Sequence, residues 1–241
     1  MARKSAPRPS AAAGPSAAEV ANARKVVAGY KASDFERPSV TCDLAIISPR
    51  NGRLEVLLIQ RGKPPFQGFW ATPGGFLEMD EDLPDGARRE LQEETGITLP
   101  VRIEQFGIYG KPGRDPRTRV ITVAYLALLS PAQLATAKAS DDARAVGWFG
   151  VERKQRPKMA FDHDTLLDDA LVHVRRSIMH TALASNLLPK EFTARQLADV
   201  YAVLMGKPQA AGPLRTTLSR NGVLKAAKSR GKWSFNAVYQ D

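Results

Sequence analysis

The sequence has little from which to build a disulfide framework or a membrane span. A single cysteine, Cys42, occurs among 241 residues, which excludes an internal disulfide bond and a metal centre built from several cysteines. Apolar runs such as residues 120–129 fall well short of the roughly 20 residues that a helix needs to cross a bilayer. The N-terminal residues also lack the apolar segment of a secretory signal. We therefore expect a soluble cytoplasmic protein with no membrane contact.

Acidic residues are scarce at the two ends of the chain, although not in its middle. The formal net charge is +10, yet residues 39–150 carry 13 basic and 14 acidic residues. Residues 186–241 carry 9 basic and only 3 acidic residues. A basic end segment beside a neutral middle is a candidate site for a polyanion. The alternative is an ordinary solvated basic surface.

The pattern of apolar residues divides the chain into four parts. Residues 1–36 are rich in Ala, Pro and Ser and are expected to be a disordered basic tail, with a short helical pattern at about 19–31. Strands are expected at 40–47, 54–60, 101–109, 120–129 and 145–149, with a helix between the second and third. This order predicts an α/β sandwich over 37–160. Helical periodicity at about 164–185 predicts a linker helix within 161–186, and 187–241 form a further domain.

The most informative segment gathers carboxylates between two glycines. Asp82 can cap a helix that begins near Pro84 and ends at Thr95 before Gly96. Its glutamates lie at i, i+3 and i+4, so they share one face and raise each other's pKa unless a cation neutralises them. A solvated acidic face is the alternative, but the flanking glycines and the spacing favour a hard divalent ion. The pattern reads Gly75-x5-Glu81-x7-Arg89-Glu90-Leu91-x-Glu93-Glu94-x-Gly96-Ile97.

This segment resembles the Nudix box. The resemblance implies a Nudix α/β/α sandwich, with Mg²⁺ as cofactor and Mn²⁺ as the alternative, and attack of water on a pyrophosphate. It also implies roles for individual residues. The metal ligands are Glu90, Glu94 and the Gly74 carbonyl; the catalytic residues are Glu93 and Glu94; the structural residues are Gly75, Glu81, Arg89 and Gly96. A later acidic loop residue, Asp142 or its neighbour Asp141, is the candidate catalytic base or extra ligand.

Segments on both sides of the box are similar to Nudix proteins that handle ADP-ribose. They are Arg61-Gly62-x-x-Pro65-Phe66-x-Gly68-x-Trp70-Ala71-x-Pro73-Gly74-Gly75 and Arg114-Asp115-Pro116-Arg117-x-Arg119-Val120. The expected ligand is ADP-ribose or a related nucleoside diphosphate derivative. Arginines can hold a diphosphate bidentately and aromatic rings can stack on adenine, although the aromatic residues can equally be core residues. The candidate ligand-binding residues are Arg61, Phe66, Trp70, Tyr109, Arg114 and Arg119.

The C-terminal segment has the pattern of two helices followed by a hairpin. Thr193 and Gln196 form a capping box at the start of a helix that ends at Gly206. A second helix is expected at 213–220, and strands at 223–227 and 232–239 flank a basic turn. The arrangement resembles a winged helix-turn-helix; a packing or dimerisation module is the alternative. The candidate DNA-binding residues are Arg215, Thr216, Ser219, Arg220, Lys228, Arg230 and Lys232.

Together, a Nudix box and a winged helix-turn-helix resemble the Nudix-related transcriptional regulators of NAD metabolism. The resemblance covers about residues 36–241 and implies a homodimeric repressor that binds operator DNA, with ADP-ribose as effector and the intact box allowing hydrolysis. The alternative is a plain Mg²⁺-dependent ADP-ribose or nucleotide-sugar pyrophosphatase with a basic C-terminal packing domain. A regulator that responds to another sugar metabolite is a third hypothesis.

Overall fold

The computed structural model describes residues 14–27, 31–97, 102–131, 133 and 143–236. The chain divides into two compact units, Met1–Arg37 and Pro38–Asp241. In the first unit, helix α1 (Ala17–Val26) begins at a capping box formed by Ser16 and Glu19, and a short 3-10 turn, η1, covers Ala32–Asp34. Residues 17–26 of the expected disordered tail are therefore helical, and this helix ends before residue 31. The capping box supplies the hydrogen bonds that the first turn lacks.

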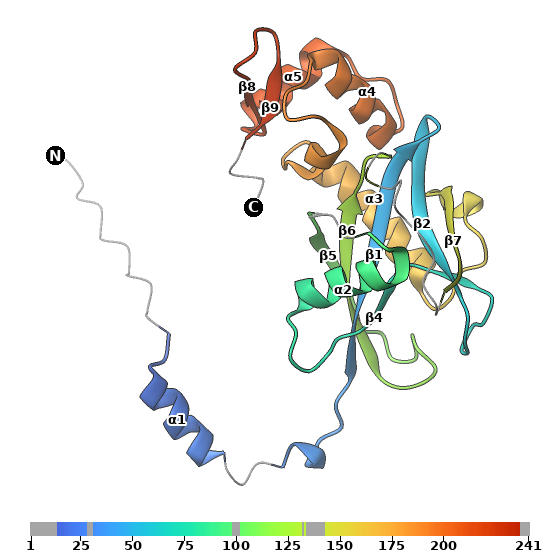
Figure 1. Ribbon diagram of the computed structural model, residues 1–241, viewed down its shortest axis with the longest axis vertical. Helices are drawn as coiled ribbons and strands as arrows, with labels where there is room; N and C mark the ends of the chain where they lie inside the picture. Colours follow the sequence, from blue (N-terminus) through green and yellow to red (C-terminus); the bar gives the residue numbers. More distant parts are fainter. Residues whose placement is uncertain (1–13, 28–30, 98–101, 132, 134–142, 237–241) are drawn as a thin grey trace, which may run out of the picture. The chain divides into compact units, whose positions relative to one another are not determined.

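The second unit is built on a seven-stranded mixed sheet with the order β3-β2-β1-β6-β5. Strand β4 pairs antiparallel with β1, β7 pairs antiparallel with β2, and β1 and β6 run parallel (Figure 1). All five strands expected from the sequence are present. The short strands β3 and β4 had no alternating pattern to reveal them. The bounds are β1 (Ser39–Arg50), β2 (Arg53–Arg61), β3 (Trp70–Ala71), β4 (Gly74–Phe76), β5 (Glu104–Tyr109), β6 (Val120–Leu128) and β7 (Ala143–Gly150).

A tight hairpin turn joins β1 to β2. Asn51 and Gly52 both have positive φ, 50° and 75°, which is the backbone geometry that an Asn-Gly pair favours in two-residue hairpins. Beside the turn, Glu55 is buried and forms ion pairs with Arg50 at 3.2 Å and Arg53 at 2.9 Å. The turn therefore fixes the register of β1 against β2.

Two helices cover the sheet on opposite faces, which confirms the expected α/β/α sandwich. Helix α2 (Leu83–Thr95) packs with Leu44 and Ile46 of β1. Helix α3 (His163–Ser177) packs with Ala45 and Ile47, the alternate residues of the same strand. Successive side chains of a strand point to opposite faces of the sheet, so those of β1 are buried alternately by α2 and by α3. Burial on both faces explains why the apolar run in β1 is nearly continuous.

Helix α3 is shorter than the periodicity predicted. It ends at Ser177 instead of continuing to residue 185, and a 3-10 turn, η3, follows at Leu183–Leu187. The reason is tertiary. The Tyr201 hydroxyl donates to the Ile178 carbonyl at 2.7 Å, and the Asn221 side-chain amide donates to the Met179 carbonyl at 2.8 Å. These carbonyls lie where a longer helix would continue.

The C-terminal residues form two helices and a small hairpin, as expected for a winged helix-turn-helix. Helix α4 (Ala194–Met205) begins at a Thr193/Gln196 capping box and ends at Gly206 with φ 67°. Helix α5 (Ala211–Arg220) is followed by strands β8 (Leu224–Ala226) and β9 (Trp233–Phe235). Residues 237–239, the end of the last expected strand, lie outside the described residues. Phe192 bridges Trp233 through two backbone hydrogen bonds, which extends the hairpin.

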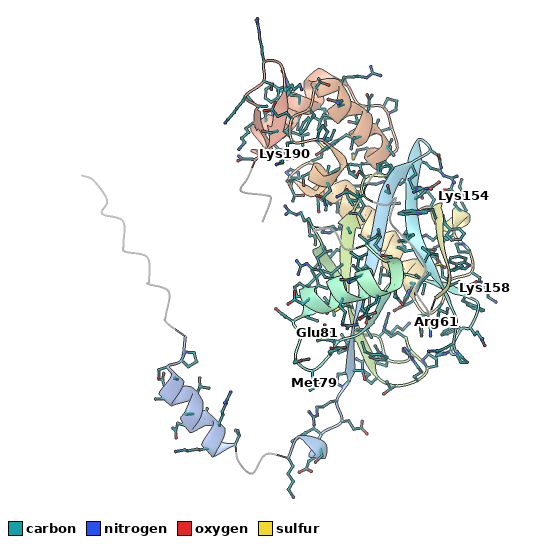
Figure 2. All side chains as sticks on the ribbon, viewed as in Figure 1. Arg61, Met79, Glu81, Lys154, Lys158 and Lys190 are labelled. Carbon is teal, nitrogen blue, oxygen red and sulfur yellow. The ribbon has the colours of Figure 1, made fainter. Side chains whose placement is uncertain are left out.

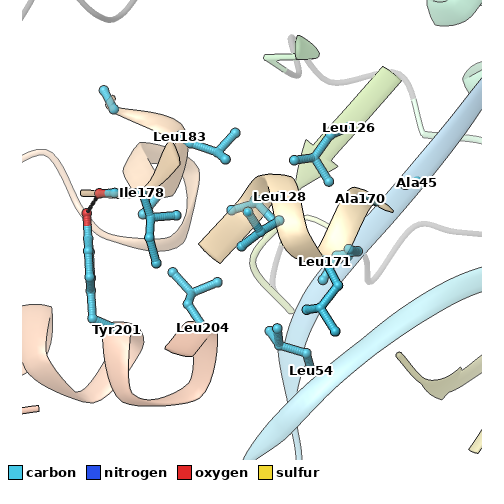
Figure 3. Close-up of a cluster of buried hydrophobic side chains, with 14 of the residues drawn as sticks. Ala45, Leu54, Leu126, Leu128, Ala170, Leu171, Ile178, Leu183, Tyr201 and Leu204 are labelled. Carbon is cyan, nitrogen blue, oxygen red and sulfur yellow. Dashed lines mark hydrogen bonds between the residues drawn. The ribbon is translucent and has the colours of Figure 1, made fainter. Parts of the chain in front are cut away.

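One buried apolar cluster runs from the sheet through α3 into the C-terminal helices. It includes Leu126, Leu171, Ile178, Tyr201 and Leu204, all of which lie close together in Figure 3. The cluster continues as far as Phe235 in β9. Because protein interiors are close-packed, helix α3 cannot shift against the sheet without disturbing α4.

Among the helices of the described residues, none combines the length and the apolar composition that a bilayer crossing requires.

Candidate active site

Helix α2 brings the box glutamates against two glycines of β4. The helix begins at Asp82, whose side chain accepts a hydrogen bond from the Leu83 amide, and ends at Gly96 with φ 69°. The Gly74 amide donates to Glu94 Oε2 at 2.6 Å. A Cβ on Gly75 would collide with the carboxylate of Glu90. Only glycine at 75 therefore lets the helix approach β4 this closely.

Arg89 hydrogen-bonds to three glutamates of the box. Its Nε and Nη2 donate to the two carboxylate oxygens of Glu81 at 3.1 and 2.7 Å. Its Nη1 donates to Glu90 at 2.7 Å and to Glu93 at 3.1 Å. A further bond reaches the Phe76 carbonyl at 3.0 Å. The expected contacts with Glu81 and Glu93 are present, and the contact with Glu90 was not expected. Figure 2 labels Glu81 below helix α2.

Burial and mutual repulsion make this cluster costly to ionise. The pKa of Glu94 is raised to about 8, chiefly by burial, with the charges of Glu90 and Asp43 also raising it and the hydrogen bond from the Gly74 amide lowering it. Burial also raises the pKa of Glu90, opposed by Arg89. A cation beside these groups would favour their charged forms. The site therefore attracts positive charge.

The donor set suits a hard divalent cation, because it offers carboxylate and carbonyl oxygens. The residues that would hold the ion are Glu90, Glu94 and the Gly74 carbonyl. In the conformation described, Glu90 and Glu93 face Arg89 and Glu94 faces the Gly74 amide. Within the described part of the chain, no three acidic, histidine or cysteine side chains converge as a metal site.

Asp141 and Asp142, the expected candidates for a catalytic base, lie outside the described residues. The strand that follows them, β7, is placed antiparallel to β2.

A pocket of about 140 Å³ adjoins the box glycines. Two of the expected ligand-binding arginines, Arg61 and Arg114, line it. The Arg61 guanidinium donates to the Pro65 carbonyl at 2.8 Å; Figure 2 labels this residue. The other lining residues are Thr41, Asp43, Ile59, Ala71, Thr72, Gly74, Gly75, Phe76, Asp115, Arg117, Val120, Phe161 and His163.

The structure does not bring the other four expected ligand-binding residues to this pocket. Trp70 packs edge-on against Phe149 with ring centroids 4.7 Å apart, as a core residue would. The Tyr109 hydroxyl donates to Asp169 of α3 at 2.9 Å, in a separate depression on β5. Phe66 is exposed and contacts the lining residue Phe161 edge-on, with ring centroids 4.9 Å apart. Arg119 is also absent from the lining. All four residues are near the motifs in sequence, but Trp70 and Tyr109 lie on strands that direct them elsewhere, and Phe66 and Arg119 lie on connecting segments outside the lining.

Phe161 is a pocket residue that the sequence did not reveal. Its ring lies 4.8 Å from the guanidinium carbon of Arg61 and 5.7 Å from that of Arg117. Its backbone has φ 52°, a left-handed conformation that a bulky residue adopts only when its surroundings impose it. Arg117 also lies over Phe76 at 5.1 Å and pairs with Asp115 at 2.6 Å. The pocket thus presents an aromatic ring close to two cations.

The pocket lining also contains a buried polar pair that sequence reasoning missed, His163 and Asp43. His163 Nδ1 accepts a hydrogen bond from the Thr72 amide at 3.0 Å, so this nitrogen carries no proton. Burial lowers the pKa of His163, opposed by the charge of Asp43, whose Oδ2 lies 4.0 Å from Nε2. The one available signal was Asp43 itself, a single charge within the apolar run 40–47.

Most of the candidate DNA-binding residues lie at the surface of the C-terminal domain. Thr216, Arg220, Lys228, Arg230 and Lys232 are exposed. The half-buried Arg215 lies over the Trp233 ring at 5.1 Å. Ser219 differs, because its hydroxyl oxygen is buried. The hairpin turn is held by Glu191, whose pKa is lowered chiefly by a hydrogen bond from Ser229.

The model of the NUDIX domain family matches residues 41–170. With the box geometry and the α/β/α sandwich, this match defines the class: the chain belongs to the Nudix family. Over a longer span it is 36% identical to the ADPR responsive transcriptional repressor NtrR of Acinetobacter baylyi, covering 83% of this chain and 79% of that protein. That similarity reaches beyond the Nudix domain and places the chain among the Nudix-related transcriptional regulators.

Two further relatives are a pyrophosphatase that acts on ADP-ribose and a protein solved with DNA and with ADP ribose. The ADP-ribose pyrophosphatase of Methanocaldococcus jannaschii is 38% identical over 56% of this chain and 74% of its own length. Shewanella oneidensis NrtR, solved with a 27mer DNA, is 29% identical with a TM-score of 0.65, covering 83% of this chain and 96% of that chain. Its NUDIX domain, solved with ADP ribose, is 31% identical with a TM-score of 0.57, covering 62% and 97%.

Replacing Arg89 with alanine is expected to lower the free energy of unfolding by about 2 kcal/mol, because charge-assisted hydrogen bonds to three glutamates are lost and like charges remain together. Urea denaturation followed by circular dichroism measures the change. Arg88→Ala is the matched control on the same helix: Arg88 makes one exposed ion pair, with Asp85 at 3.1 Å, and should cost less than about 0.5 kcal/mol. Equal losses in the two variants would contradict the role of Arg89.

Proposed function

We propose that this protein is a DNA-binding transcriptional regulator, a repressor of NAD-metabolism genes, whose Nudix domain binds ADP-ribose. The observation that carries the proposal is that residues 38–241 form one compact unit containing both the box pocket and the basic C-terminal hairpin domain. We divide this unit into a Nudix domain at 37–160, a linker helix at 161–186 and a winged helix-turn-helix at 187–241. The similarity to NtrR across 83% of the chain supports the same combination.

The pocket suits a nucleoside diphosphate. Burial lowers the pKa of Arg61, and the nearby charge of Arg117 also lowers it. The negative charge of a diphosphate beside both arginines would offset these two effects by stabilising the charged guanidinium groups. We assign Arg61, Arg114 and Arg117 to the diphosphate. Phe161 is the residue we assign to the adenine, because it is an aromatic ring that lines the pocket beside Arg61 and Arg117, the arginines assigned to the diphosphate. The two named relatives that respond to or cleave ADP-ribose support this ligand.

The C-terminal domain suits double-stranded DNA. Thr216 and Arg220 on α5 and the three basic residues of the turn between β8 and β9 are exposed. Helix α5 is the candidate for the major groove, and the turn is the candidate for the phosphate backbone. The structure of NrtR with a 27mer DNA supports this use of the domain. Binding as a homodimer to a two-fold operator in the cytoplasm belongs to the same proposal.

A gel-shift assay tests the regulator. We expect a sequence-specific shift of DNA from the protein's own upstream region or from neighbouring NAD genes, with an affinity that ADP-ribose changes by fivefold or more, roughly the lower limit of allosteric coupling. Replacing Lys228, Arg230 and Lys232 together by alanine should weaken DNA binding by about tenfold or more and reduce its salt dependence. Lys154→Ala and Lys158→Ala, on the Nudix domain, are the controls. Absence of a specific shift would contradict the regulator.

The adenine assignment has its own test. Phe161→Leu keeps an apolar side chain but removes the stacking surface, so we expect ADP-ribose to bind about tenfold more weakly, the loss typical of one base–aromatic stack. Tyr109→Leu is the matched control, since it also removes an aromatic ring and Tyr109 lies outside the pocket, with its hydroxyl bonded to Asp169. Isothermal titration calorimetry measures both. A larger loss for Tyr109→Leu than for Phe161→Leu would reverse the assignment.

Hydrolysis of ADP-ribose or a nucleotide sugar is a second, separable function, favoured by the intact box. A bound divalent ion, which we expect to be Mg²⁺ with Mn²⁺ as the alternative, would neutralise the diphosphate and lower the pKa of water. The protein positions the carboxylates. Arg89 holds Glu93 at 3.1 Å, and the Gly74 amide holds Glu94 at 2.6 Å. Glu93 is 57% exposed in its side chain and open to water, which suits a proton acceptor.

If the box is catalytic, Glu93→Gln and Glu94→Gln should each lower Mg²⁺-dependent cleavage of ADP-ribose by at least about 100-fold, the scale of a lost general base. Release of AMP measured by liquid chromatography checks this. The control is Asp85→Asn, whose carboxylate pairs only with Arg88 among the described contacts on the exposed face of α2. Unchanged turnover in the two glutamine variants would remove the box from the reaction, while leaving ADP-ribose binding and DNA binding to be judged separately.

A further inference from the structure

We propose that Asp162 couples the ligand pocket to the C-terminal domain: a bound diphosphate replaces Asp162 as the partner of Arg114, and Asp162 is released. This inference rests on the proposed function and names the step through which the pocket controls DNA binding. Arg114 lines the pocket, while Asp162 precedes the first residue of helix α3. One residue therefore belongs to the ligand site and the other to the helix that leads away from it.

In the structure described, Asp162 holds Arg114 away from any ligand. The Arg114 side chain is 4% exposed. Its Nε donates to Asp162 Oδ2 at 3.0 Å and its Nη2 donates to Oδ1 at 2.6 Å, a bidentate pair. Asp43 is the next nearest carboxylate, at 3.9 Å from Nη2. A diphosphate entering the pocket competes with Asp162 for this planar fork, because carboxylate and phosphate oxygens satisfy the same donors.

Asp162 has another partner available once it is released. It occupies the N-cap position of α3, where an aspartate normally accepts a hydrogen bond from the first turn, yet it makes no side-chain cap bond. Its carboxylate bonds to Arg114 instead, and its ψ of 20° lies outside the extended region that a capping residue adopts. When Arg114 turns to a diphosphate, rotation of residue 162 to the extended conformation lets the freed carboxylate cap its own helix, where the helix dipole favours negative charge. The exchange thus replaces one ion pair by two favourable interactions.

Helix α3 carries this change to the C-terminal domain. Beyond its last turn, the Ile178 carbonyl accepts from Tyr201 of α4 at 2.7 Å, and the Met179 carbonyl accepts from Asn221 after α5 at 2.8 Å. Tyr201 is fully buried. The helix and α4 also share one apolar core (Figure 3). A small movement at residue 162 must therefore be accommodated where α4 and α5 meet the helix.

The test measures ADP-ribose affinity and the ratio of DNA affinities with and without ADP-ribose. Asp162→Asn removes the charge but keeps a residue that caps helices well. We expect ADP-ribose to bind about tenfold more tightly, because Arg114 has lost its competitor. We also expect the DNA affinity ratio to fall to within about twofold of one. Asp162→Ser, which also caps without charge, is the second variant if asparagine perturbs folding.

Asp169→Asn is the matched control on the same helix, since Asp169 accepts from Tyr109 and not from Arg114. It should retain the ratio of the unmodified protein. If the unmodified protein shows the DNA effect and Asp162→Asn keeps it unchanged, the coupling inference is wrong while the regulator stands. If the unmodified protein binds ADP-ribose but no specific DNA, or DNA but no ADP-ribose, the proposed function fails and the coupling with it.

Discussion

The structure depends most on how it holds several carboxylates close together. Glu81, Glu90 and Glu93 all hydrogen-bond to the single guanidinium of Arg89, while Glu94 is satisfied by a backbone amide of β4. Like charges at this spacing repel, so the helix could not dock against β4 without these donors. The same arrangement buries the carboxylates of Glu90 and Glu94, which raises their pKa. A cation beside them would stabilise their charged forms. Folding and chemistry thus share one electrostatic constraint.

Helix α3 is the second constraint, because it belongs to both halves of the unit. Its apolar face is buried on the sheet, and the carbonyls just beyond it bond to side chains of the C-terminal domain. Its N-cap residue Asp162 and its first residue His163 contact Arg114 and Thr72 at the pocket. A helix with fixed contacts at both ends is well suited to link two sites. A Nudix pocket and a basic C-terminal domain joined in this way differ from a hydrolase with a loosely attached tail.

Sequence patterns predicted the elements better than their ends. Capping residues placed the starts of α2 and α4, and glycines with positive φ placed their ends at Gly96 and Gly206. These are local effects of backbone and side chain. The end of α3 was not predictable, because no proline or glycine marks it. It is set by Tyr201, which lies 23 residues away from its acceptor in sequence.

The sequence by itself determined the fold class, the box and its charges, because helical spacing alone brings Glu90, Glu93 and Glu94 to one face. Only the tertiary structure decided which aromatic and basic residues meet at the pocket. Trp70 and Tyr109 are near the motifs in sequence but point elsewhere, whereas Phe161 and Arg117 come together from separate loops. The physical reason is that side-chain direction on a twisted sheet, and contact between distant segments, follow from packing and not from spacing along the chain.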